Sequence, residues 1–164
     1  MAYKHLFSLL AIALTFAAFY PYIRNILTHT VRPHVFSWVI WGITTMIVFF
    51  AQLADGGGAG AWPVGVSAAI TLFIALLAFL KRADISITRM DWLFFLSALG
   101  SLPLWFITSE PLAAVIILTT VDVLGFGPTI RKAWQDPWSE SLLFFSLFAL
   151  RNLLVILALQ HYSL

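Results

Sequence analysis

The sequence predicts an all-α, polytopic membrane protein with six transmembrane helices, and three observations lead to this fold class. Of the 164 residues, 62% are hydrophobic and only 10% are charged, which leaves too few polar side chains to cover a water-soluble domain. The hydrophobic residues fall into six long runs, and the basic residues gather in alternate connections between these runs. We therefore expect the lipid bilayer to be the main surrounding of the chain.

Each apolar run has the length of a helix that crosses the hydrocarbon core of a bilayer, which takes about 17–25 residues. The fourth run is the weakest, because Gly100 and Pro103 interrupt it, but a stop and restart signal for helices follows at residues 109–111. The first run lacks a following cleavage site, so we expect it to be a mature helix rather than a signal peptide. The six predicted spans are residues 6–27, 34–53, 61–80, 91–108, 111–132 and 141–160.

The basic residues predict the orientation of the spans. Seven lysines and arginines lie in or beside the connections after the first, third and fifth spans, whereas the opposite side carries only Lys4. The positive-inside rule then places the N-terminus and the C-terminus outside and the three basic connections in the cytoplasm. We expect an integral protein of the bacterial inner (plasma) membrane. The seven basic residues are Arg24, Arg32, Lys81, Arg82, Arg89, Arg131 and Lys132.

Several function classes find no support in the residue types. The chain has no cysteine, and its four histidines show no ligand spacing, so we expect no metal site and no cofactor. No basic cluster is dense enough to indicate a nucleic-acid partner. No pair of nucleophile and base stands at a predicted membrane surface, so we do not expect an enzyme. The one local concentration of charge, Asp84, Arg89 and Asp91, is interpreted as a solvated cytoplasmic loop.

An internal repeat is the second strong pattern. The first span ends Phe19-Tyr-Pro21-Tyr-Ile23-Arg24, and the fifth ends Phe126-Gly-Pro128-Thr-Ile130-Arg131. A single offset of 107 residues matches the Phe, Pro, Ile and Arg of the two segments and also lays the second span on the sixth. Because the first and fifth spans cross in the same direction, the sequence predicts a parallel repeat, which is a known plan of transporters.

These segments resemble the PQ-loop superfamily, which includes the SWEET and SemiSWEET sugar transporters, the lysosomal cystine transporter and the KDEL receptor. The second copy matches best, because Pro128-Thr-Ile-Arg-Lys-Ala-Trp-Gln-Asp-Pro-Trp-Ser139-Glu-Ser141 has the family's spacing from the proline to the downstream serine. The glutamine that gives the family its name is replaced here by Tyr22 and Thr129. The chain is thus identified as a divergent, bacterial-type relative.

The resemblance implies a three-helix bundle, a linker helix and a second three-helix bundle. We assign residues 1–82 to the first bundle, 83–110 to the linker helix region and 111–164 to an incomplete second bundle of two helices. An incomplete bundle needs another subunit to close it, so a homodimer or another helix partner is expected.

Asp122 and Arg151 carry charges near the middle of the fifth and sixth spans. A charge at that depth costs at least ~2.5–3.5 kcal/mol, so we expect the two residues to face each other or a water-filled cavity. Two interpretations stay open: the residues form a structural ion pair, or Asp122 takes up a proton while Arg151 holds an anionic group of a solute. The sequence does not show which face of its helix Arg151 occupies.

Further polar and aromatic residues fall on the same helical faces as these charges. On the fifth span, Thr119, Asp122 and Phe126 are spaced as one stripe of a helix, and the second span carries a similar stripe. Such residues line a solute site or only bond helix to helix. The third span adds Ser67 and Thr71. The candidate substrate-binding or coupling residues are Asp122, Arg151, Asn152, Trp41, Thr45, Gln52, Thr119 and Phe126.

Pro21 and Pro128 occupy matching positions of the two copies. A proline inside a helix removes one hydrogen bond and clashes with the preceding turn, so the pair is predicted to act as hinges or merely to bend the helices for packing. The patterns together favour a small-solute transporter that works by alternating access, with proton coupling as one version. The alternative is a receptor or an accessory and assembly subunit that uses the same fold without transport.

Overall fold

The computed structural model describes the backbone of residues 2–54, 56, 58–81, 87–107 and 111–159, and their side chains except at 2, 101–107, 111–115 and 118. The described residues form six α-helices, two short 3-10 turns and no β-strand, so the all-α prediction is confirmed. The elements are α1 (Ala2–Leu27), α2 (Val35–Ala54), η1 (Gly58–Gly60), α3 (Ala61–Leu80), α4 (Arg89–Ile107), α5 (Pro111–Gln135), η2 (Pro137–Ser139) and α6 (Leu142–Ala158).

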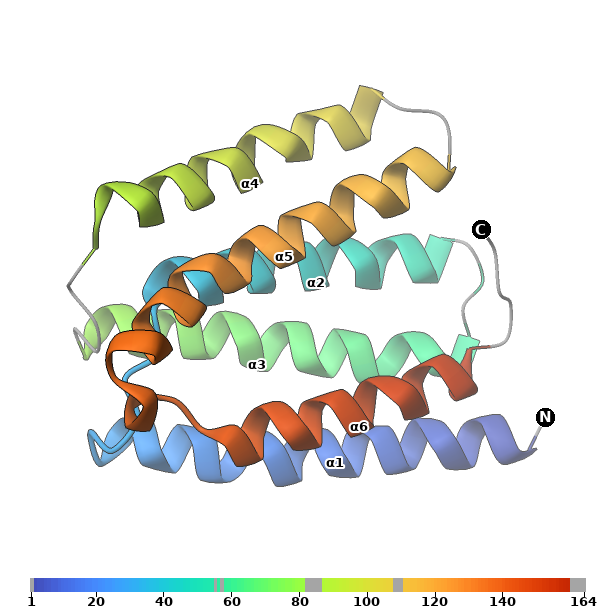
Figure 1. Cartoon of the computed structure of the whole chain (residues 1–164). Coiled ribbons are helices and arrows are strands. Elements are labelled where there is room, and N and C mark those ends of the chain that lie inside the picture. The colour runs from blue at the N-terminus through green and yellow to red at the C-terminus, as the bar shows by residue number, and fades with distance from the viewer. Residues whose placement is uncertain (1, 55, 57, 82–86, 108–110, 160–164) are drawn as a thin grey trace.

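Successive helices run in opposite directions, so the two termini lie at the same end of the bundle (Figure 1). The closest packing joins α2 to α3, α1 to α6 and α4 to α5, and further contacts join α2 to α5 and α1 to α3. Gly42 allows the close approach of α2 and α3, because a Cβ atom there would lie 2.6 Å from Leu72 Cδ2. By contrast, α5 and α6 make little contact with one another beyond the η2 turn.

Three stretches of the described chain are long and apolar enough to cross a membrane, namely Tyr3–Leu27, Val35–Ala54 and Gly58–Leu80. The helix α6 is equally apolar in character but shorter. Large hydrophobic side chains stand on the outer faces of these helices, among them Phe79 and Leu142. A surface of this kind is costly in water and favourable in lipid. The structure is therefore compatible with an integral membrane protein.

The largest buried cluster lies where α1, α2 and α6 meet, toward the end of the bundle opposite the termini. It is built around the rings of Phe19, Tyr22, Trp38 and Phe144. The Tyr22 and Phe144 ring centroids are 4.4 Å apart, and those of Tyr22 and Trp38 are 5.1 Å apart. Stacked and tilted rings at these distances add to the stabilisation that comes from their buried area. This aromatic cluster closes the interior of the bundle at that end.

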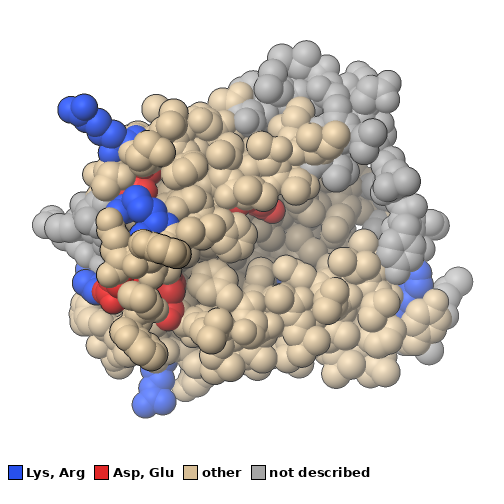
Figure 2. Space-filling view, in the orientation of Figure 1, with Lys and Arg blue, Asp and Glu red and all other residues tan. Residues whose placement is uncertain are grey.

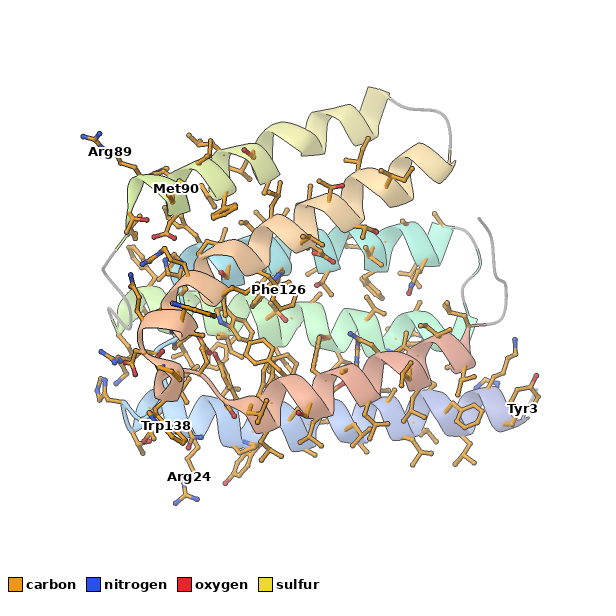
Figure 3. All side chains as sticks on the ribbon, viewed as in Figure 1. Tyr3, Arg24, Arg89, Met90, Phe126 and Trp138 are labelled. Carbon is orange, nitrogen blue, oxygen red and sulfur yellow. The ribbon has the colours of Figure 1, made fainter. Side chains whose placement is uncertain are left out.

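Charged side chains gather around the same end, as Figures 2 and 3 show with basic and acidic atoms on one side and Arg24 and Arg89 projecting from it. The interpretation of Asp91 as part of a solvated loop is wrong, because its side chain is fully buried. Asp91 accepts hydrogen bonds from the backbone N–H of Thr88 at 2.8 Å and from two guanidinium nitrogens of Arg131 at 2.9 and 2.7 Å. Arg89 is exposed as expected, and Asp84 lies outside the described residues.

Candidate functional site

Five of the eight candidate residues line one cavity of about 150 Å³ near the middle of the bundle. It is lined by α1, α2, α3, α5 and α6, where the divergence of α5 from α6 leaves room. The five are Trp41, Thr45, Asp122, Phe126 and Asn152. Six residues complete the lining, of which only Thr71 was expected from the sequence to lie on a polar face; the others are Phe19, Trp38, Phe144, Phe145 and Phe148. The cavity therefore has a mainly aromatic wall.

A second cavity of about 240 Å³ adjoins the first and shares Thr45, Asp122, Phe148 and Asn152 with it. Its further lining includes Arg151 and the valines 48, 64 and 155, which lie closer to the end of the bundle that holds the termini. Figure 2 shows the face hollowed beside the acidic atoms over the middle of α5. The two cavities together form a cleft that runs from the centre toward the end of the termini.

Asp122 stands on α5 with its side chain open to this cleft. One carboxylate oxygen accepts a hydrogen bond of 2.7 Å from the hydroxyl of Thr44 on α2. The same hydroxyl lies 3.0 Å from the carbonyl oxygen of Ile40 and 3.2 Å from that of Trp41, so its single proton is shared among three acceptors. The contact of the carboxylate with a neutral hydroxyl neutralises none of its charge.

Arg151 stands on α6 and is 3% exposed. Its Nε donates to the hydroxyl of Thr15 on α1 at 3.2 Å, and one terminal nitrogen donates to the amide oxygen of Asn152 at 2.7 Å. The other terminal nitrogen donates to the carbonyl oxygen of Pro63 on α3. The guanidinium carbon also lies 5.1 Å from the centroid of the Phe148 ring. The protein thus surrounds this cation with its own acceptors and ties α6 to α1 and α3.

Asp122 and Arg151 line the same cavity, but no ion pair joins them among the described residues. Each side chain instead binds a threonine on the helix that packs against its own. The structure also shows which face of α6 carries Arg151: the side chain points toward α1 and α3. The ion-pair interpretation of these two residues therefore does not describe this conformation.

Residues that are 107 positions apart make matching contacts. Thr15 of α1 bonds Arg151 of α6, and the positions 107 later and 107 earlier, Asp122 of α5 and Thr44 of α2, are also bonded to each other. The aromatic contacts follow the same rule: Phe19 and Phe148 have ring centroids 5.5 Å apart, and those of the matching Phe126 and Trp41 are 4.6 Å apart.

Nearer the basic end, the ring of Tyr22 packs at a tilt against Phe144, and the matching Thr129 donates to the hydroxyl of Ser37 at 2.9 Å. At the turns, the backbone N–H of Arg32 donates to the carbonyl oxygen of Ser139, its own match, at 3.1 Å. The α1–α6 and α5–α2 contacts are thus equivalent at three levels of the cleft. The offset seen in the sequence was the signal that could have found Thr15 and Thr44.

The tryptophan of the cleft depends on a glycine. The indole nitrogen of Trp41 donates to the backbone oxygen of Asp122 at 3.3 Å, and its ring lies against Phe126, which points from α5 into the middle of the molecule in Figure 3. A Cβ atom on Gly125 would lie only 2.7 Å from that indole nitrogen. The absence of a side chain at Gly125 therefore leaves the space that the indole ring of Trp41 occupies against α5.

Two candidate residues lie apart from the cleft. Gln52 and Thr119 line neither cavity within the described part of the chain, and the Gln52 amide oxygen is buried there without a hydrogen-bond partner. Pro21 and Pro128 lie inside α1 and α5, which continue past them as helices. Both prolines lie closer to the basic end than the cleft does. A bend at either proline would therefore move the part of its helix that lies at the basic end.

Polar contacts join the helices at the basic end of the cleft, beside a further cavity of about 480 Å³ whose lining includes Phe126, Thr129 and Glu140. Lys132 of α5 pairs with Glu140 at 2.6 Å, and the phenol of Tyr22 on α1 donates to the other oxygen of that carboxylate at 3.0 Å. Lys132 also donates to the carbonyl oxygen of Arg32, and on the surface Arg32 pairs with Asp136.

No family model, curated protein or solved structure matches the chain.

Proposed function

We propose that this protein is a small-solute transporter of the PQ-loop type that works by alternating access in a bacterial plasma membrane. The observation that carries the proposal is the set of equivalent contacts between α1 and α6 and between α5 and α2. Alternating access needs two halves that can exchange roles around a central site, and two matched helix pairs meet that requirement.

The matched contacts also support a parallel repeat of α1–α2 and α5–α6 about an axis along the membrane normal. Each copy contributes one helix to each contact, because the first helix of one copy packs on the second helix of the other. Thr15, Thr44, Asp122 and Arg151 then form two crossing polar pairs on either side of the axis. Rotation of one copy against the other would alter both pairs together.

The shape of the cleft corresponds to one end state of such a cycle. The aromatic cluster around Tyr22 and the contact of Lys132 with Glu140 join the helices at the basic end, where a separate cavity of about 480 Å³ lies between α5 and α6, whereas the cleft extends toward the termini past the valines 48, 64 and 155. With the basic end in the cytoplasm, this is an outward-facing state. In this proposal, Pro21 and Pro128, which lie inside α1 and α5, are the hinges at which the basic end opens.

Proton coupling fits the surroundings of Asp122. A carboxylate that is open to the cleft, and bonded only to a shared hydroxyl, can bind a proton when the cleft faces one side and lose it on the other. Arg151 fits a structural role that joins α6 to α1 and α3, since three of its hydrogen bonds already go to the protein.

The absence of cysteine allows a test that needs no substrate. Val48→Cys places a thiol in the open part of the cleft, and Ser37→Cys places one at the closed end, where Ser37 is fully buried. Each variant is reconstituted into vesicles and treated with a membrane-impermeant maleimide from either side. We expect Val48→Cys to react from the outside only and Ser37→Cys to be protected.

Glu140→Gln, which weakens the contacts with Lys132 and Tyr22, is then added to each reporter. Alternating access requires a reciprocal change: the Ser37→Cys thiol becomes reactive from the cytoplasmic side while the Val48→Cys thiol loses reactivity from the outside. Asp136→Asn is the matched control, because it removes an exposed ion pair at the same end. If the Ser37→Cys thiol gained reactivity and the Val48→Cys thiol kept its own, the result would contradict the transporter proposal and favour the receptor or accessory role.

A further inference from the structure

We propose that the cleft takes small organic cations, either protonated amines or quaternary ammonium compounds, in preference to sugars and anions. This substrate class rests on the proposed function, because it names what the proposed transporter would carry. The geometry points to it through three features of the cleft: the charge that the cleft leaves open, the character of its wall and its volume.

The first feature is charge. Asp122 and Arg151 are the two charged residues that line the two cavities of the cleft. The Arg151 guanidinium is buried, and all three of its nitrogens already donate to Thr15, Asn152 and the Pro63 carbonyl. Only part of its donor capacity is therefore left for an anionic solute. The carboxylate of Asp122 has no cationic partner among the described residues and opens into both cavities. The charge offered to a solute is therefore negative.

The second feature is the aromatic wall beside that carboxylate. The ring centroid of Trp41 lies 4.6 Å from that of Phe126 and 6.3 Å from that of Phe145, and Phe148 completes this side. The faces of aromatic rings carry partial negative charge, and together with a carboxylate they form the usual surroundings of a bound ammonium group. Phe148 already contacts one cation of the protein, Arg151, at 5.1 Å.

The third feature is volume. The aromatic cavity of about 150 Å³ equals in volume the engineered cavities that hold benzene, so it suits a compact ligand such as a trimethylammonium group. Its neutral polar side chains are Thr45, Thr71 and Asn152. A sugar carries a hydroxyl on nearly every carbon, and these three side chains together with the Asp122 carboxylate cannot satisfy that many buried donors and acceptors. The adjoining cavity of about 240 Å³ leaves room for a polar tail.

The test compares choline with 3,3-dimethylbutan-1-ol, which has the same shape but carbon in place of the charged nitrogen. Both are titrated into the purified full chain in lipid nanodiscs at pH 6 and pH 8.5, and binding is measured by thermal stabilisation and by calorimetry. We expect choline to bind at least about tenfold more tightly than its neutral analogue, because the cation gains the carboxylate and the ring faces together.

Asp122→Asn should abolish this preference, and Asp136→Asn, which removes a distant surface carboxylate, should preserve it. Phe126→Leu should weaken choline binding more than binding of the neutral analogue, since it removes one ring face and keeps an apolar side chain. Circular dichroism of each variant shows whether it is folded, and the Asp136→Asn comparison corrects for the loss of one charge.

Equal affinity for choline and its analogue at both pH values would overturn the inference, and so would the absence of binding by choline, tetramethylammonium and ethanolamine to folded protein. Failure of the proposed function has a different signature. A choline preference without the reciprocal change in thiol reactivity would keep the ligand class and reject transport. Reciprocal reactivity without a choline preference would keep transport and reject the ligand class.

Discussion

The hydrogen bond between Thr15 and Arg151 should couple α1 to α6 by a measurable free energy. Thr15→Val keeps the shape of the side chain and removes the hydroxyl that accepts from Arg151 Nε at 3.2 Å. Interhelical hydrogen bonds inside membranes are worth ~0.6–1.7 kcal/mol each. Because Thr15 is fully buried and its partner is charged, we expect a loss at the upper end, about 1.5 kcal/mol. Arg151→Met removes two such bonds, to Thr15 and Pro63, and one bond to Asn152 of its own helix, and should cost about 2–5 kcal/mol.

A double-mutant cycle isolates the pair. Unfolding free energies of the wild type, both single variants and the double variant are measured by titration with sodium dodecyl sulfate in mixed micelles, with helix content as the readout. We expect the double variant to be more stable than the sum of the single losses predicts, by about 1–1.5 kcal/mol. Thr120→Val is the matched control, because Thr120 also donates to the carbonyl four residues earlier, as Thr15 does, but is exposed. Its loss should stay below about 0.5 kcal/mol.

Additivity of the two losses within about 0.3–0.5 kcal/mol would refute the reasoning, because it would mean that the hydroxyl and the guanidinium do not interact. A large loss in the Thr120→Val control would refute it in another way, since the effect would then belong to the bond within the helix. The matching cycle of Thr44→Val with Asp122→Asn extends the test to the equivalent α5–α2 contact.

Two further predictions follow from single contacts, and a third concerns the oligomeric state. Gly125→Ala should displace the indole of Trp41 and weaken choline binding at least about threefold by calorimetry, whereas Gly100→Ala, with open space around its Cβ, should leave binding unchanged. Asp91→Asn should lower the unfolding free energy by about 1–3 kcal/mol in the same titration, because it weakens a buried carboxylate's bonds to the N-terminus of α4 and to an arginine, while Asp136→Asn should cost less than about 1 kcal/mol. The homodimer stays a prediction, and a mass measured in nanodiscs that equals one chain would contradict it.

The helices could be predicted closely from the sequence, because their lengths follow from apolar runs. The predicted span 61–80 coincides with α3, and the predicted span 34–53 differs from α2 by one residue at each end. The interpretation of Asp91 as part of a solvated loop failed, because a local concentration of charged residues does not show which groups a carboxylate binds. The local pattern Thr88-Arg-Met-Asp91 is that of a capping box, and it was the available signal for the helix start. Its second partner, Arg131, comes from a distant helix and could not be read locally.

The candidate site was predicted in part. A stripe on one helix predicts which residues share a face, and so Asp122 and Phe126 were found together. It does not predict how far along the helix the cavity extends, and Thr119 and Gln52 consequently lie outside its lining. The aromatic residues Phe144 and Phe148 were not predicted, because apolar residues surround them in α6 and the sequence does not distinguish rings that face the interior from rings that face lipid.

The sequence by itself determined the helical class, the number of helices, their alternating direction and the offset of 107 residues, since each of these is a property of composition, length or spacing along the chain. Only the tertiary structure decided the partners of the two central charges. Their depth in the helices is a one-dimensional quantity, whereas the choice between an ion pair and two separate threonine contacts depends on how far α5 diverges from α6. That divergence is set by the packing of α1 on α6 and of α2 on α5, and it leaves Asp122 open to the cleft while Arg151 is buried and bonded to the protein.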